Sequence, residues 1–246
     1  MLYPVLCEIF KTKTVVDANG NKYPLSANIS LQEGQFLYDL IVNNHSISRS
    51  LEIGCAYGIS SLFICNALED QPNKEHIIID PFQEKNYKNI GITNLDKASV
   101  DFYTLIEEKS EIAMPKLLQS NPGSIDLIFI DGFHSFDQVL LDFYYANRLL
   151  REGGIIVFDD CTYPSVAKVL SYILKYPAYK LFAQMNETNM IKKVIRSVVN
   201  LFPDSFYSIF LPAGLKNLTE RARYTSMVAI QKISPDTRGY KWFRNF

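Results

Sequence analysis

Short apolar segments alternate with longer segments of helical periodicity along most of the chain. Runs of four to six apolar residues are typical of buried strands, and apolar residues recurring every three or four positions are typical of helices. This alternation predicts repeated β-α units, which build a parallel sheet. The expected strands cover residues 51–53, 76–80, 102–106, 125–130 and 155–158, and the expected helices cover 31–43, 59–68, 110–118, 138–150 and 166–174.

The C-terminal part of the chain departs from this alternation. Residues 206–211 and 225–233 are two further strand candidates without a strong helix between them, which predicts an antiparallel hairpin. Residues 184–204 are interpreted as a helical insertion, and residues 1–45 as an N-terminal helical cap. The predicted fold is a single α/β domain over residues 1–246 with a doubly wound, mostly parallel, Rossmann-like sheet of about seven strands.

Composition narrows the class of protein without indicating a reaction. The chain has 246 residues, 48% of them hydrophobic, and a formal net charge of -1. This charge favours a small-molecule partner over nucleic acid or an anionic membrane. Four scattered cysteines without a C-x-x-C pair, and an N-terminus without a secretory pattern, lead us to expect a cytoplasmic protein. Whether it assembles as a homo-oligomer is left open.

A pair of glycines follows the first predicted strand. Gly54 and Gly58 bracket a turn before the helix that begins at Ile59, and glycine lets a backbone approach a ligand closely. Taken alone, such a pair more often only turns the chain. Residue 56 is alanine, so the spacing differs from the G-x-G-x-x-G fingerprint of dinucleotide sites, and NAD becomes the weaker alternative.

Acidic residues recur where the predicted strands end. Asp80, Asp131 and the pair Asp159-Asp160 each follow a strand. In open α/β sheets, ligands bind beyond the carboxyl ends of the strands. Asp80 is placed to accept hydrogen bonds from ribose hydroxyls, and the alternative is that it only caps the turn after its strand.

Several segments together resemble the class I S-adenosylmethionine-dependent methyltransferases. The similarity is carried by Glu52-Ile53-Gly54-Cys55-Ala56-Tyr57-Gly58, by Asp80, and by Ile130-Asp131-Gly132-Phe133-His134-Ser135. Within that class the chain is similar to the macrocin, mycinamicin and catechol types of O-methyltransferase, which are usually metal-dependent. The resemblance implies S-adenosylmethionine as cofactor, bound by Glu52, Gly54, Tyr57, Gly58, Asp80, Ser110 and Asp131.

The same resemblance implies a divalent cation at the acidic strand ends. Asp131, Asp159 and Asp160 match the acidic positions that bind the ion in metal-dependent members. Carboxylate oxygens suit a hard cation such as Mg²⁺. The alternative is a set of solvated loop acids.

His134 is the candidate general base. It follows Asp131 within one turn, and an imidazole with a pKa of about 6.5 can take a proton from an alcohol that a cation has acidified. The alternative is a helix N-terminal residue that only hydrogen-bonds the loop. His45 and His76 have no acidic partner at ligand spacing and are expected to be structural.

These residues predict metal-assisted O-methylation of a hydroxyl on a small molecule or a sugar-containing natural product. The alternatives are an NAD-dependent oxidoreductase on a similar sheet and a non-catalytic module that only binds the cofactor.

Overall fold

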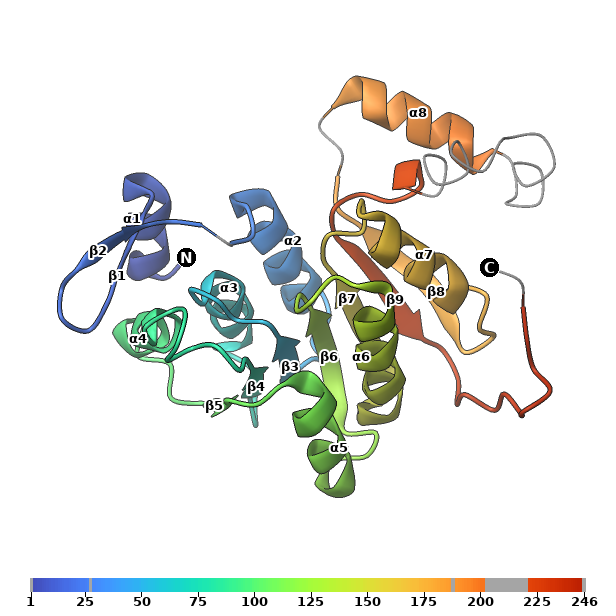
Figure 1. Cartoon of the computed structure of the whole chain (residues 1–246), viewed down its shortest axis with the longest axis horizontal. Helices are drawn as coiled ribbons and strands as arrows, with labels where there is room; N and C mark the ends of the chain where they lie inside the picture. The colour runs from blue at the N-terminus through green and yellow to red at the C-terminus, as the bar shows by residue number, and fades with distance from the viewer. Residues whose placement is uncertain (1, 27, 187–188, 202–220, 245–246) are drawn as a thin grey trace.

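A computed structural model describes residues 2–26, 28–186, 189–201 and 221–244. Within these ranges the centre of the molecule is a seven-stranded sheet in the order β5-β4-β3-β6-β7-β9-β8 (Figure 1). Its strands are β3 (Arg49–Ile53), β4 (Glu75–Ile79), β5 (Tyr103–Ile106), β6 (Ile125–Ile130), β7 (Leu150–Phe158), β8 (Tyr179–Gln184) and β9 (Val228–Lys232).

The five strands from β5 to β7 are parallel to one another, and β9 is antiparallel to both β7 and β8. The predicted doubly wound, mostly parallel sheet with an antiparallel C-terminal part is therefore confirmed. The partners of the last strand differ from those expected, because β9 pairs with β7 and with β8, a strand that the sequence pattern did not predict. The expected partner, residues 206–211, lies outside the described residues.

Helices cover both faces of the sheet (Figure 1). On one face, buried residues of α5, α6 and α7 pack against strand residues such as Ile128 and Ile130. On the other, α1, α2, α3 and α4 pack against residues such as Leu127 and Phe129. The helices are α1 (Pro4–Thr12), α2 (Leu31–Val42), α3 (Ile59–Leu68), α4 (Ile90–Lys97), α5 (Ser110–Ser120), α6 (Phe136–Leu149), α7 (Pro164–Ile173) and α8 (Met190–Asn200).

The N-terminal segment is more than a helical cap. After α1, a short antiparallel hairpin of β1 (Thr14–Val16) and β2 (Lys22–Pro24) precedes α2. The start of α2 is held by a capping box, in which the Ser30 side chain accepts from the Glu33 amide and the Glu33 carboxylate accepts from the Ser30 amide. This capping box holds Glu33 in the first turn of α2, where its side chain lines the cavity described below.

In the described part of the chain, no helix is both long enough and apolar enough to cross a membrane.

Candidate active site

A cavity of about 920 Å³ lies at the carboxyl ends of the parallel strands. This volume is within the range of small-molecule sites, roughly 300–1,000 Å³. The loops after β3, β4, β6 and β7 form most of its wall, and the beginnings of α2, α3, α5 and α6, with Tyr163 before α7, complete it. The strand-end loops supply the residues 53–56, 79–82, 131–134 and 159–160.

Gly54 brings the loops after β3 and β6 into direct contact. Its φ is +91°, and a Cβ at this position would lie 2.2 Å from the backbone oxygen of Asp131. Gly58 has a φ of +76°, and a Cβ there would lie 2.8 Å from the backbone oxygen of Gly91 in α4. Both glycines are therefore required by the packing of one backbone against another, and Gly54 also lines the cavity.

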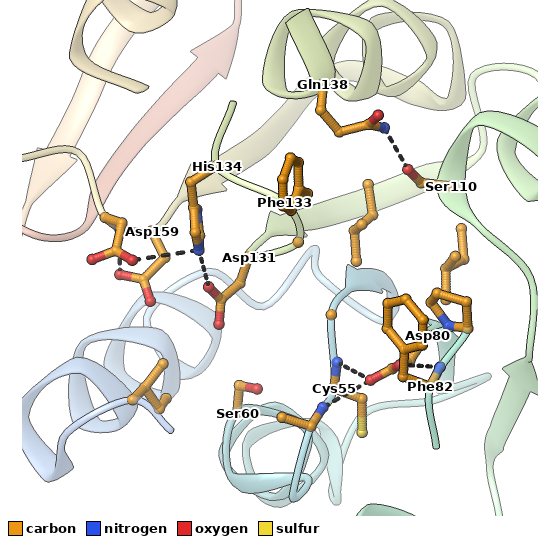
Figure 2. A pocket seen from close by; sticks show the side chains of 18 of the residues that line it. Cys55, Ser60, Asp80, Phe82, Ser110, Asp131, Phe133, His134, Gln138 and Asp159 are labelled. Atoms are coloured by element: carbon orange, nitrogen blue, oxygen red, sulfur yellow. Dashed lines mark hydrogen bonds and ion pairs between the residues drawn. The ribbon is translucent and has the colours of Figure 1, made fainter. Parts of the chain in front are cut away.

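Asp80 ties the end of β4 to the glycine turn. Its Oδ2 accepts hydrogen bonds from the backbone amides of Cys55 (3.0 Å) and Ala56 (2.9 Å), and its Oδ1 accepts one from Phe82 (2.8 Å) (Figure 2). The Phe82 bond is the turn-capping contact considered as the alternative role. Because a carboxylate oxygen has two lone pairs, Oδ1 keeps one acceptor position at the cavity wall.

Glu52, Tyr57 and Gly58 do not line the cavity. Successive strand residues point to opposite faces of a sheet. The Glu52 side chain is fully buried on the α3 side, where it accepts a hydrogen bond from Ser61 and lies 3.1 Å from Nε2 of His76. These residues support the turn from behind.

His76 thus has an acidic partner that its sequence spacing did not reveal. The parallel register of β3 and β4 places Ser50 opposite His76. The Ser50 hydroxyl lies 2.8 Å from Nδ1 of the ring, and Glu52 lies near the other nitrogen. The buried side chains of His76 and Glu52 are part of the core between the sheet and α3. His76 is therefore structural, as expected.

His134 and three aspartates meet on one side of the cavity (Figure 2). Nε2 of His134 lies 3.4 Å from Oδ2 of Asp160 and 3.7 Å from Oδ1 of Asp131. The histidine is held from behind, since the Ser165 hydroxyl donates to its backbone oxygen and the Tyr163 ring packs edge-on against the imidazole at 5.8 Å. The sequence correctly predicts that Asp131, His134, Asp159 and Asp160 share one cavity.

Burial and mutual repulsion shift the pKa values of this cluster. Burial, reinforced by the Asp159 charge, raises the pKa of Asp131 well above its usual range. Burial, reinforced by the Glu33 charge, raises the pKa of Asp159 to about 8. Burial also raises the pKa of Asp160 and lowers that of His134. The cavity therefore has a neutral imidazole near neutral pH and carboxyl groups that a cationic ligand would stabilise in their charged form.

Comparison with known proteins places this geometry in a known fold. The family profile described as "Methyltransferase domain" matches residues 51–161. Among solved structures, an O-methyltransferase from Bacillus cereus in complex with SAH superposes with a TM-score of 0.60 at 18% identity, covering 72% of this chain and 82% of that one. The chain therefore shares the fold of this methyltransferase structure. The fold that the sequence resemblance implies is thus confirmed.

Two curated proteins are similar to this methyltransferase-fold chain. It is 25% identical to the probable caffeoyl-CoA O-methyltransferase 3 of Dictyostelium discoideum, over 69% of this chain and 64% of the relative. It is 28% identical to the catechol O-methyltransferase of Niastella koreensis, over 54% of this chain and 58% of the relative. The matched segments thus span less than two thirds of the length of either relative.

The carboxylates of the cavity are not arranged as a preformed ion site. In the ranges that the structure describes, no group of three His, Cys, Asp or Glu side chains is placed to hold one metal ion. The imidazole of His134 is near both Asp131 and Asp160, at 3.7 and 3.4 Å. The oxygen ligands are of the type that Mg²⁺ takes.

The opposite end of the cavity is formed by Ser110 and Gln138. Ser110 begins α5, and its hydroxyl accepts a hydrogen bond of 2.9 Å from Nε2 of Gln138 (Figure 2). The same amide nitrogen donates to Oδ1 of Asp142 at 3.1 Å. Both amide protons are therefore directed at protein partners. Sequence reasoning found Ser110 through the family resemblance but missed Gln138, Glu33 and Tyr163, which lie at helix beginnings rather than at strand ends.

Asp142 supports this end and gives a pH-dependent prediction. Its side chain is 1% exposed, its Oδ2 has no hydrogen-bond partner, and burial raises its pKa to about 6. The folded state thus binds more protons than the unfolded state between about pH 4 and 6, so stability falls as pH rises through this window. Asp142→Asn should raise the free energy of unfolding by about 1–3 kcal/mol at about pH 7.5 and by little at about pH 4. Urea unfolding at both pH values checks this, and an equal effect at both would contradict it.

Proposed function

We propose that this chain is an S-adenosylmethionine-dependent methyltransferase that methylates a hydroxyl group of a small molecule. The observation that carries the proposal is the imidazole of His134, whose Nε2 lies 3.4 Å from Asp160 in an acid-lined cavity beside the glycine turn of a fold shared with methyltransferases. The names of the two curated relatives, both O-methyltransferases, support the choice of a hydroxyl acceptor.

The chemistry of the cavity wall suits this cofactor. S-adenosylmethionine, when bound, supplies a methyl group on a positively charged sulfur that is its own leaving group. Glu33, Asp131 and Asp159 offer carboxyl groups to its positive charges, and Oδ1 of Asp80 offers an acceptor to its ribose. Ser110 and Gln138 then line the adenine end.

The residues around His134 suit proton removal from the acceptor. Nε2 of His134 would take the hydroxyl proton, and the carboxylate of Asp160 at 3.4 Å would stabilise the imidazolium that results. The hydrogen bond from Ser165 and the Tyr163 ring hold the histidine in place. The remaining work of the protein is alignment of the hydroxyl with the methyl group.

Ligand binding provides the direct test. S-adenosylhomocysteine at about 100 times its dissociation constant should raise the unfolding temperature by roughly 5–10 °C, because binding to the folded state alone adds about 2.7 kcal/mol. NAD at the same concentration should leave it unchanged. Stabilisation by NAD and not by S-adenosylhomocysteine would favour the oxidoreductase alternative, and cofactor binding without methyl transfer to any hydroxyl acceptor would favour the non-catalytic module.

A metal-assisted form of the same reaction is the second candidate. It is favoured by the raised pKa values of Asp131, Asp159 and Asp160, since a divalent cation would relieve the repulsion that contributes to them. In this form, chelation should lower methyl transfer by at least about tenfold and Mg²⁺ should restore it. Full activity in chelator would remove the cation from the mechanism.

A further inference from the structure

Helix α8 displays an apolar face to solvent. Met190, Ile191, Val194 and Ile195 recur at the spacing that places residues on one side of a helix, and their exposed fractions are 70%, 72%, 58% and 46%. The helix start is well defined, because Oδ1 of Asn189 accepts hydrogen bonds from the amides of Ile191 and Lys192.

Part of the attachment of α8 to the domain lies on a different side of the helix. Arg196 donates a hydrogen bond of 3.0 Å to the backbone oxygen of Tyr224, and Val199 is buried. At 100° per residue, Arg196 points away from Ile191 and Val194. A surface helix normally buries its apolar stripe against the core, whereas α8 is anchored in part by a basic residue and turns much of that stripe outward.

The charge of α8 is uniformly basic. Its sequence contains Lys192, Lys193 and Arg196 and no acidic residue, and both lysines are exposed. The net charge of the whole chain, -1, conceals this local excess. A helix with a basic polar side, an exposed apolar side and low overall hydrophobicity is the kind that lies flat in the interface of an anionic membrane.

The segment that contains α8 leaves the sheet at the carboxyl end of β8, which lies on the same side of the sheet as the cavity. Strand β8 is antiparallel to β9, which is antiparallel to β7, so β8 and β7 end at the same edge. At the far end of the insertion, Arg221 donates a hydrogen bond of 2.7 Å to the backbone oxygen of Thr162, between Asp160 and Tyr163 of the cavity wall. Figure 1 shows α8 beyond this end of the sheet.

We propose that α8 docks this domain on an anionic lipid surface, with Met190, Ile191, Val194 and Ile195 in the acyl boundary and Lys192 and Lys193 near the headgroups. Docking would hold the active-site edge of the sheet close to the membrane. Charge decides between a lipid surface and a second copy of the chain, since a twofold contact between two α8 helices would bring like charges together. The proposal does not depend on methyl transfer.

Vesicle sedimentation of the full chain tests the proposal. The protein should partition onto phosphatidylcholine vesicles that contain phosphatidylserine at least about tenfold more strongly than onto phosphatidylcholine alone, and salt should weaken this binding. Ile191→Asp with Val194→Asp should lower the partition coefficient at least about tenfold, and so should Lys192→Glu with Lys193→Glu.

Matched variants control for hydrophobicity and charge. Ile112→Asp changes an isoleucine of α5 that is 48% exposed, and Lys11→Glu with Lys22→Glu changes the net charge as the α8 lysine pair does. Both should bind vesicles like the parent, and all variants should keep its unfolding temperature. Absence of binding to the anionic vesicles, or equal binding of the Ile191 and Val194 variant, would overturn the proposal. A dimer that this variant dissociates, without vesicle binding, would overturn it in favour of a second copy.

Discussion

His134→Ala is expected to lower methyl transfer by about 10²- to 10⁴-fold while leaving the affinity for S-adenosylhomocysteine nearly unchanged. His134 supplies the imidazole in the wall of the cavity, and burial lowers its pKa. Its loss removes the proton acceptor but not the walls that bind the cofactor. Single-turnover rates and a binding titration measure the two quantities separately.

The matched control for this variant is His45→Ala. His45 is exposed and lies outside the cavity, so its replacement should leave both quantities unchanged. If His134→Ala weakened cofactor binding and the rate in equal measure, the histidine would act in binding rather than as the base.

Gly54→Ala is expected to lower the free energy of unfolding by about 2–6 kcal/mol. One part is the strain of a side chain at a φ of +91°, and the other is the contact of its Cβ with the Asp131 backbone oxygen at 2.2 Å. Neither backbone can give way easily, because Gly54 directly follows β3 and Asp131 directly follows β6. Urea unfolding gives the change in stability, and any folded protein should show a reduced thermal shift with S-adenosylhomocysteine.

Gly20→Ala isolates the contribution of the contact. Gly20 has a nearly equal φ of +86°, but a Cβ there would have nothing within 4 Å. Both substitutions therefore share the strain, and their difference should be the contact between strand ends, about 1–3 kcal/mol. Equal destabilisation by the two would show that the approach of Gly54 to Asp131 costs nothing.

Most of the parallel sheet could be predicted because its signals are local. Residues 125–130 are apolar throughout and form β6 with every residue buried. Strand β8 escaped prediction because it is an edge strand whose side chains at Lys180, Leu181 and Phe182 are exposed. Its membership in the sheet depends on pairing with β9, which is more than 40 residues away in the sequence.

The helical insertion predicted at residues 184–204 agrees only in part with the structure. Gln184 belongs to β8, and the helix α8 runs from Met190 to Asn200. Its amphipathic pattern was visible in the sequence, but a pattern of this kind ordinarily predicts a buried apolar side. The contact between Arg196 and Tyr224, with the burial of Val199, shows which side faces the domain.

The sequence alone was enough to locate the acid-lined cavity, because parallel strands bring their carboxyl ends to one edge wherever the sheet order places them. Asp80, Asp131, Asp159 and Asp160 meet there for that reason. The tertiary structure alone decided that Glu52 turns away toward His76 and that Glu33 and Gln138 enter from helix beginnings. These placements depend on strand register and helix docking, which are contacts between distant parts of the chain and leave no mark on local periodicity.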